Sequence, residues 1–149
     1  AAAGTMTAGI DLRPMTAGDY DHILALWQRS EGVGLGSSDT RADIEAYLIR
    51  NPGLSLVAES GGCIVGAVLC GHDGRRGLLY HLAVDRAYRG RGLGRRMAET
   101  ALALLREQGI HKAYIMVFHQ NKEGRAFWQK TGWETRADLI PMCIPLIES

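Results

Sequence analysis

The chain has 149 residues, 46% of them hydrophobic, and a formal net charge of +1 at pH 7. This length and composition fit one compact domain with its own core and leave too little chain for two ordinary domains. A nearly neutral chain is not expected to coat a nucleic acid, and no apolar run approaches the length of a membrane span. Neither nucleic acid nor membrane is therefore expected as a partner.

Three cysteines, Cys63, Cys70 and Cys143, are odd in number and lack C-x-x-C spacing. This pattern disfavours a disulfide framework and a zinc site, so we expect core thiols of a cytoplasmic protein and no metal cofactor. Residues 1–5 precede the first methionine, Met6, and look like a cloning remnant. The expected single domain runs from residue 6 to residue 149.

The first part of the chain predicts a strand over residues 10–14 and then two helices. The apolar stripe of the first helix consists of Tyr20, Ile23, Leu24 and Trp27. The second helix is expected to begin after residues 37–40 and to end near Ile49. Between the helices lies a glycine-rich loop over residues 32–36, next to Glu31. That glutamate is a candidate ligand for an amine, and a solvated glutamate in a flexible connection is the alternative.

The middle of the chain predicts a hairpin of strands over residues 54–60 and 63–71, followed by a third strand over 78–84. A long amphipathic helix follows, with Gly109 as its C-cap, and then a strand over residues 112–118. Strand, helix and strand in this order form a right-handed parallel crossover. A short helix over residues 122–131 and terminal strands from Trp133, the last over 142–147, complete the prediction.

The chemistry is expected where the third strand meets the long helix, at Arg89-Gly90-Arg91-Gly92-Leu93-Gly94. A helix start exposes unpaired N–H groups, and glycine lets a bulky anion approach them, so a phosphate or pyrophosphate is the expected guest. A nucleotide P-loop would need Gly-Lys-Ser/Thr, and a dinucleotide site would need G-x-G-x-x-G. An ordinary turn with solvated arginines remains the alternative.

The same stretch resembles the R/Q-x-x-G-x-G/A signature of the GNAT superfamily of acetyl-CoA-dependent N-acetyltransferases. Residues 121–133 are similar to that family's second signature, an Asn followed by a helix with F-Y-x-x-x-G-F/Y. The pattern is nearest to that of bacterial ribosomal-protein and N-terminal acetyltransferases. The resemblance implies an α/β fold with a mixed, mostly antiparallel sheet, one parallel crossover pair and about four flanking helices.

By this resemblance the strand binds the pantetheine arm of acetyl-CoA, and the loop binds its pyrophosphate. The residues expected to bind the coenzyme are Leu82, Ala83, Val84, Arg89, Gly90, Arg91, Gly92, Leu93, Gly94, Arg95, Asn121 and Phe127. The catalytic pattern departs from the family. Met116 stands where the base, a glutamate, is expected, and Trp128 stands where the acid, a tyrosine, is expected.

Alternation along the strand places Tyr80 and His81 on opposite faces. Family members carry polar groups two or four residues before the position of Leu82, which selects Tyr80 as a proton relay or amine ligand, with a core tyrosine as the alternative. His81 is expected to pack under the long helix. The candidate catalytic residues are therefore Tyr80 and Glu31.

The function favoured is transfer of an acetyl group from acetyl-CoA to a primary amine by direct attack. The alternative is a CoA-binding or regulatory module that has the coenzyme cleft and catalyses little. The acceptor is expected to be a small-molecule amine, a protein N-terminus or a lysine, and a homodimer is left open.

Overall fold

The computed structural model describes residues 9–147, so the expected cloning remnant lies outside the described residues. In chain order the elements are β1 (Ile10–Pro14), η1 (Ala17–Asp19), α2 (Tyr20–Gln28), α3 (Arg41–Arg50), β2 (Leu56–Ser60), β3 (Cys63–His72), β4 (Gly77–Val84), η2 (Arg86–Tyr88), α4 (Leu93–Glu107), β5 (Ala113–Ile115) and α5 (Lys122–Lys130). They fall into two compact units, one ending at Met116 and one beginning at Val117.

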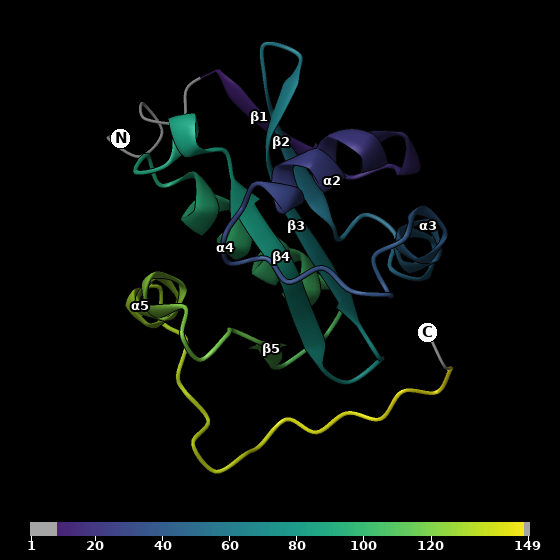
Figure 1. Cartoon of the computed structure of the whole chain (residues 1–149), viewed down its shortest axis with the longest axis vertical. Coiled ribbons are helices and arrows are strands. Elements are labelled where there is room, and N and C mark those ends of the chain that lie inside the picture. The colour runs from purple at the N-terminus through teal and green to yellow at the C-terminus, as the bar shows by residue number, and fades with distance from the viewer. Residues whose placement is uncertain (1–8, 148–149) are drawn as a thin grey trace. The chain divides into compact units, whose positions relative to one another are not determined.

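The first unit contains a five-stranded sheet whose spatial order follows the chain, β1-β2-β3-β4-β5 (Figure 1). The first four strands pair antiparallel with their neighbours. β5 pairs parallel with β4, because α4 carries the chain back across the sheet between them. The predicted mixed sheet with one parallel crossover pair is confirmed.

Helices cover both faces of this sheet, with α2 and α3 on one face and α4 on the other. Two glycines of β3 show the division. A methyl group at Gly66 would lie 2.8 Å from Sδ of Met97 in α4, whereas a methyl group at Gly71 would meet Tyr47 in α3. The core on the α2 face includes Trp27, whose side chain is fully buried.

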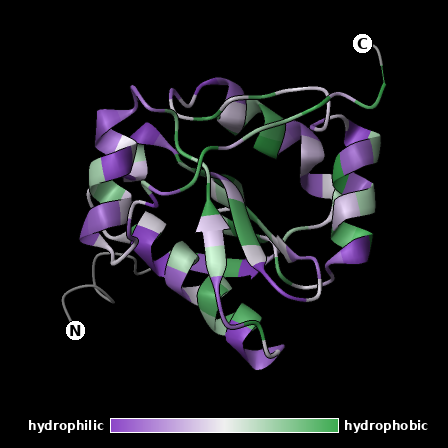
Figure 2. Ribbon diagram, turned by 90° about the horizontal axis from the view of Figure 1, so that it is seen from below, coloured by the Kyte–Doolittle hydropathy of each residue, from purple (hydrophilic) through white to green (hydrophobic). Residues whose placement is uncertain are grey.

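α4 lies close to the sheet because glycines face it. At Gly77, the first residue of β4, a methyl group would lie 2.7 Å from Cδ1 of Leu105. The buried face of α4 consists of Leu93, Met97, Ala98, Ala101 and Leu105. These residues recur every three or four positions and form one apolar stripe along the helix. Figure 2 shows that the helices carry both hydrophobic and hydrophilic residues.

The predicted terminal strands are wrong. Described residues 133–147 contain no strand, and β5 is only Ala113–Ile115, shorter than the predicted 112–118. An alternating apolar pattern forms a strand only where a neighbouring edge accepts its hydrogen bonds, and Pro141 and Pro145 each remove a donor. The exposed apolar residues of this segment are Leu139, Ile140, Met142, Ile144, Leu146 and Ile147.

The prediction of three core thiols is right only for Cys70. Cys63 follows the hairpin turn and Cys143 lies in the strandless segment, so both are exposed. Burial raises the pKa of the Cys70 thiol to about 12, which leaves it unreactive at neutral pH.

Among the described residues, no helix combines the length and apolar character that a membrane crossing requires.

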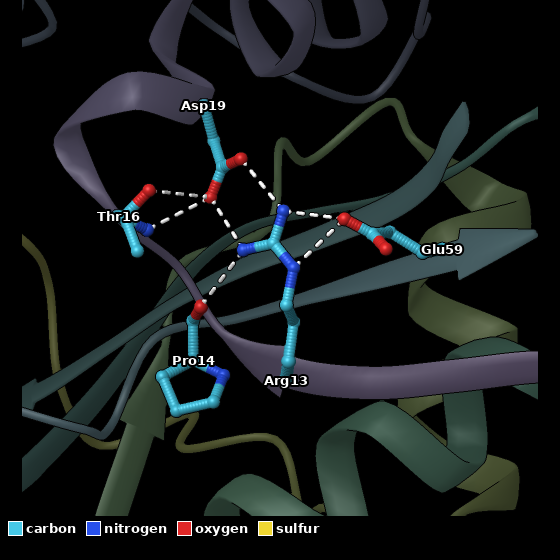
Figure 3. Close-up of polar contacts among 5 residues, drawn as sticks. All are labelled: Arg13, Pro14, Thr16, Asp19 and Glu59. Carbon is cyan, nitrogen blue, oxygen red and sulfur yellow. Dashed lines mark hydrogen bonds and ion pairs between the residues drawn. The ribbon is translucent and has the colours of Figure 1, made fainter. Parts of the chain in front are cut away.

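An ionic network joins β1 to β2 and to the start of α2 (Figure 3). The Arg13 guanidinium donates to both carboxylate oxygens of Asp19 at 2.8 Å and to Glu59 at 2.6 Å. Asp19 also accepts the backbone N–H of Thr16 at 2.8 Å. These hydrogen bonds, that of Arg13 first, hold the pKa of Asp19 below its ordinary value of 3.8, against the opposing effect of burial.

We expect Asp19→Asn to lower the free energy of unfolding at pH 7 by about 1–3 kcal/mol, because a hydrogen-bonded guanidinium loses its charged partner. A carboxyl group whose pKa is lowered by folding stabilises the protein above its unfolded-state pKa, and this stabilisation is lost as the pH falls through the lower folded-state pKa. The difference between parent and variant should therefore narrow below about pH 4. Urea titrations at pH 7 and pH 3 measure it.

Glu99→Gln is the matched control, because Glu99 pairs with Arg95 on the exposed side of α4 at 2.9 Å. Such a pair contributes about 0.5 kcal/mol or less. Equal losses for the two variants at pH 7, or a loss for Asp19→Asn that does not depend on pH, would contradict the role given to the network.

Candidate active site

β4 contains a bulge in its second half. Ala83 pairs with Ala67 and Tyr80 pairs with Leu69, so two residues of β4 lie opposite the single residue Val68 of β3. A bulge adds one residue to one strand and reverses the facing of the side chains beyond it. Tyr80 and Ala83 consequently share the α2 face of the sheet.

His81 occupies the bulge in a left-handed backbone conformation, with φ of 53°. Among the described residues, no other non-glycine residue has a positive φ. Its carbonyl accepts the indole N–H of the buried Trp27 at 2.9 Å, and its ring packs edge-on against that indole with centroids 5.0 Å apart. Its Nε2 lies 2.9 Å from Oδ1 of Asp39, in the loop before α3.

The prediction that His81 packs under α4 is therefore wrong, because the bulge interrupts the regular alternation of side chains between the two faces of β4. Tyr80 and His81 face the same side, with ring centroids 6.3 Å apart. Tyr80 also packs against the core on that face, and burial raises the pKa of its phenol. A neutral phenol can donate a proton or a hydrogen bond, but it cannot serve as the base at neutral pH.

β4 has an open edge beside the bulge. β5 pairs only with residues 77–79 of β4, so the β5-side edge of residues 80–84 has no strand partner in the described chain. An open edge presents backbone N–H and C=O groups to an extended ligand. Ala83 is buried, so it can offer only its main chain to such a ligand, whereas Leu82 and Val84 are half-buried.

The loop after β4 presents a row of free backbone donors. Gly90 and Gly92 have φ of 78° and 81°, and Gly92 is the N-cap of α4. Within the described residues, no acceptor bonds the N–H groups of residues 90–95. The first turn of α4 contains no acidic residue, and its N-cap offers no side chain. Successive free N–H groups at a helix start form a concave site for an anion.

The arginines of the loop are held in different ways. Arg89 donates to the Val84 carbonyl at 2.9 Å, and Arg91 donates to the Ala87 carbonyl at 3.3 Å and lies over the Tyr88 ring. Arg95 pairs with Glu99 in the next turn. Arg96 instead donates to the Ile10 carbonyl of β1. Arg89, Arg91 and Arg95 thus add positive charge near the free donors, and Arg96 fixes α4 to the sheet.

Glu31 does not meet Tyr80 in a shared cluster. Its side chain is 81% exposed and pairs at 3.3 Å with Arg86, which is 80% exposed. Arg86 lines a pocket of about 400 Å³ at the end of β4. The pocket residues are Leu26, Arg29, Ser30, Val84, Asp85, Arg86 and Arg89. Glu31 thus lies near a rim with three arginines, an unsuitable place for a ligand of a cationic amine.

Comparisons with known proteins agree with this geometry. The model of the acetyltransferase (GNAT) family matches residues 20–133. The protein belongs to the GNAT acetyltransferase family. An acetyltransferase of Pectobacterium atrosepticum is 34% identical over 139 residues, covering 93% of this chain and 97% of the relative. This GNAT protein is thus an acyltransferase that depends on acetyl-CoA.

Two solved structures share the fold of this GNAT protein. Ard1 from Thermoplasma volcanium has a TM-score of 0.77 at 23% identity, covering 87% of this chain and 86% of the other. The PaiA N-acetyltransferase from Thermoplasma acidophilum, solved in complex with coenzyme A, has a TM-score of 0.75 at 16% identity, covering 85% and 91%. At these identities the likeness concerns the fold alone.

The second GNAT signature forms α5 in the unit that begins at Val117. Asn121 is the N-cap of α5, and its Oδ1 accepts the N–H of Gly124 at 3.0 Å. Phe127 packs edge-on against Trp128, which packs against Trp133. Asn121 thus has a local structural role whatever else it contacts. Met116, at the family's glutamate position, is 68% exposed.

Sequence reasoning missed Asp39 and placed His81 incorrectly. Asp39 lies 42 residues from His81 along the chain, and only the folding of the α2–α3 loop onto β4 joins them. The bulge has no clear mark in the sequence, since no glycine occupies it. Leu93 was expected to contact the coenzyme, but its side chain is buried under α4, so only its N–H is available.

We expect Gly92→Ala to weaken acetyl-CoA binding far more than Gly109→Ala does. Both glycines have φ of 81° and open space around them, so alanine strains both by a similar amount of about 1–2 kcal/mol. Gly109 follows the other end of α4, whereas Gly92 positions the free donors. Calorimetric titration with acetyl-CoA measures the affinity, and thermal unfolding checks that stability falls equally. Equal affinities for the two variants would remove Gly92 from the anion site.

Proposed function

We propose that this GNAT protein is an N-acetyltransferase that moves an acetyl group from acetyl-CoA to a primary amine by direct attack. The observation that carries the proposal is the row of unbonded N–H groups over residues 90–95, next to an open β4 edge. Together they match the two parts of a coenzyme that has a pyrophosphate and an extended, amide-containing arm. We infer that residues 6–149 act as one domain, since the family match spans both units.

The residues present fit this coenzyme. Helix-start N–H groups favour a doubly charged pyrophosphate, and the missing side chains of Gly90 and Gly92 leave room for it. Arg89, Arg91 and Arg95 add attraction that salt should screen. Arm amides can bond to the main chain of Leu82, Ala83 and Val84 along the open edge. Asn121 and Phe127 stay proposed contacts on the strength of the family signature.

The chemical demand falls mainly on the amine. A free alkylamine has a pKa of about 10 and a thiol about 8.5, so the attacking amine must lose a proton while the thiol leaves readily. Backbone N–H groups at the open edge can polarise the acyl carbonyl oxygen. Binding both substrates together supplies a further part of the rate by proximity. This protein therefore needs a proton acceptor but no strong acid, which is compatible with Met116 and Trp128 at the family's usual positions.

The acceptor itself is an amine of a small molecule, a protein N-terminus or a lysine. Among the solved neighbours is an aminoglycoside acetyltransferase, AAC(6')-Iy, in complex with a bisubstrate analogue. At 16% identity the similarity to that neighbour concerns the fold alone, so it does not indicate which amine this protein acetylates. A homodimer remains a prediction.

Release of CoA thiol from acetyl-CoA, measured across amino acids, polyamines, aminoglycosides and peptides with free N-termini, tests the function. We expect amine-dependent thiol release and an acetylated product with the acetyl mass on nitrogen. The competing function is a CoA-binding module that catalyses little. Tight acetyl-CoA binding with no thiol release above the buffer rate for any of these amines would establish that module instead.

We also expect Tyr80→Phe to lower turnover by about 10-fold or more while leaving acetyl-CoA affinity unchanged, because the phenol orients the amine or passes on its proton and does not contact the pyrophosphate. Burial raises the pKa of Tyr80, so the phenol stays protonated throughout the assay range. Steady-state kinetics and calorimetry on the same samples separate the two effects. Parent-like turnover would reduce Tyr80 to a core residue, its alternative role.

A further inference from the structure

We propose that His81 removes the proton from the acceptor amine and that Asp39 holds the His81 ring in the position and tautomer this requires. The inference rests on the proposed function and names the proton acceptor that the family positions Met116 and Trp128 do not provide. It follows from four observations on the His81 ring: its partner, its free nitrogen, its backbone and its place on the open edge.

The partner is a carboxylate in a semi-enclosed place. The side chains of His81 and Asp39 are only 14% and 13% exposed, and Nε2 lies 2.9 Å from Oδ1. The other carboxylate oxygen of Asp39 accepts the N–H of Gly36 at 2.9 Å. The backbone carbonyl of Asp39 accepts the Tyr20 hydroxyl at 2.6 Å. A carboxylate can only accept, so Nε2 carries the proton in this pair.

A neutral imidazole with its proton on Nε2 has a lone pair on Nδ1. Nδ1 of His81 has no hydrogen-bond partner within the described residues. Every buried side-chain nitrogen and oxygen among these residues does have a partner. Nδ1 is therefore not fully buried, and in the proposed role it is the nitrogen that meets the amine. This is the arrangement of a base with an orienting carboxylate behind it.

The backbone of His81 shows that the ring is held against a conformational cost. A non-glycine residue in the left-handed region costs about 1–3 kcal/mol and persists where the surroundings fix it. Here the Trp27 indole bonds the His81 carbonyl and packs against the ring. Asparagine tolerates this conformation better than most residues do. The left-handed backbone therefore does not by itself require histidine, although the ring's contacts with Trp27 and Asp39 would be lost in asparagine.

His81 also lies within residues 80–84, the stretch of β4 whose edge is open toward β5. Within residues 9–147, two titratable side chains contact the ring. Asp39 faces it from the α2–α3 loop and Tyr80 from β4, while Tyr20 of α2 reaches it only through the Asp39 carbonyl. The Arg41 guanidinium of α3 lies 4.8 Å above the Tyr20 ring. A proton gained on Nδ1 thus forms an imidazolium paired with one carboxylate.

The protons balance as follows. An alkylammonium carries three N–H protons, and the amide product keeps one. His81 Nδ1 takes the first proton and passes it to solvent. The amine nitrogen then bonds to the acyl carbon as the carbon–sulfur bond breaks, and the sulfur leaves with the electron pair of that bond. The last proton lost from nitrogen ends on this sulfur, giving the free thiol of CoA.

The main test is His81→Asn, which keeps a residue that tolerates the left-handed conformation. We expect a folded protein with acetyl-CoA affinity like that of the parent and a modestly lower melting temperature, because the ring's packing on Trp27 is lost. Turnover should be lower by about 100-fold or more, the usual contribution of a general base. The pH profile of kcat/KM should differ between parent and variant, because the variant lacks the group that accepts the proton from the amine. His22→Asn, on the exposed side of α2, is the matched control and should behave like the parent.

The role of Asp39 is tested by Asp39→Asn together with nitrogen-15 NMR of the histidine rings. We expect the parent's His81 to carry its proton on Nε2, in spectra assigned by comparison with His81→Asn. Asp39→Asn should lower turnover by about 10-fold or more and alter this tautomer population, with acetyl-CoA affinity unchanged. This readout needs no acceptor and does not depend on the activity of the loaded enzyme.

The outcomes separate the two proposals. A parent enzyme that acetylates an amine while His81→Asn keeps its rate and pH profile would overturn the role of His81 and leave the function intact. A parent ring protonated on Nδ1 would do the same. A parent enzyme that acetylates no amine would overturn the function and the inference together.

Discussion

The bulge in β4 is the constraint on which the site depends. One extra residue opposite Val68 reverses the facing of β4 beyond Tyr80, and this brings Tyr80 and His81 to one side of the sheet. A regular strand would have placed them on opposite faces. The bulge is held by a buried donor, the Trp27 indole, which bonds the displaced carbonyl of His81. The packing of α2 thereby fixes the backbone conformation of a strand that is expected to bind the substrate.

The second determinant of the site is how closely α4 lies to the sheet. Gly66 and Gly77 leave no side chain between β3, β4 and the helix, so Met97 and Leu105 pack directly on the strands. The hydrogen bond from Arg96 to the Ile10 carbonyl adds a tie to β1. The start of α4 is therefore fixed beside the end of β4, and its free N–H groups need no movement to receive an anion. Preorganised donors of this kind lose little entropy on binding.

The sequence predicts the fold well where local patterns determine it. β1, α3 and the β2–β3 hairpin lie within a few residues of their predicted bounds, and α2, α4 and the glycine loop occur where their patterns predicted them, since periodicity and turn residues specify such elements. The terminal strands fail because a strand requires a partner edge, which no local pattern supplies. The pairing of His81 with Asp39 fails for a similar reason: it depends on a bulge and on a loop that folds back across 42 residues. Motifs therefore predict a phosphate site, whereas only the fold brings the proposed base to its carboxylate.

The two halves of the site differ in how they tolerate change. The proposed anion half would use main-chain N–H groups, which are independent of side-chain identity except at the glycines of positive φ. The proposed catalytic half uses side chains that three elements hold together: α2 through Trp27, the α2–α3 loop through Asp39, and β4 through His81. A family can therefore keep its coenzyme signature while its base moves among strands and loops. In this chain the position of the usual glutamate holds an exposed methionine, and the carboxylate that pairs with His81 lies on the α2–α3 loop.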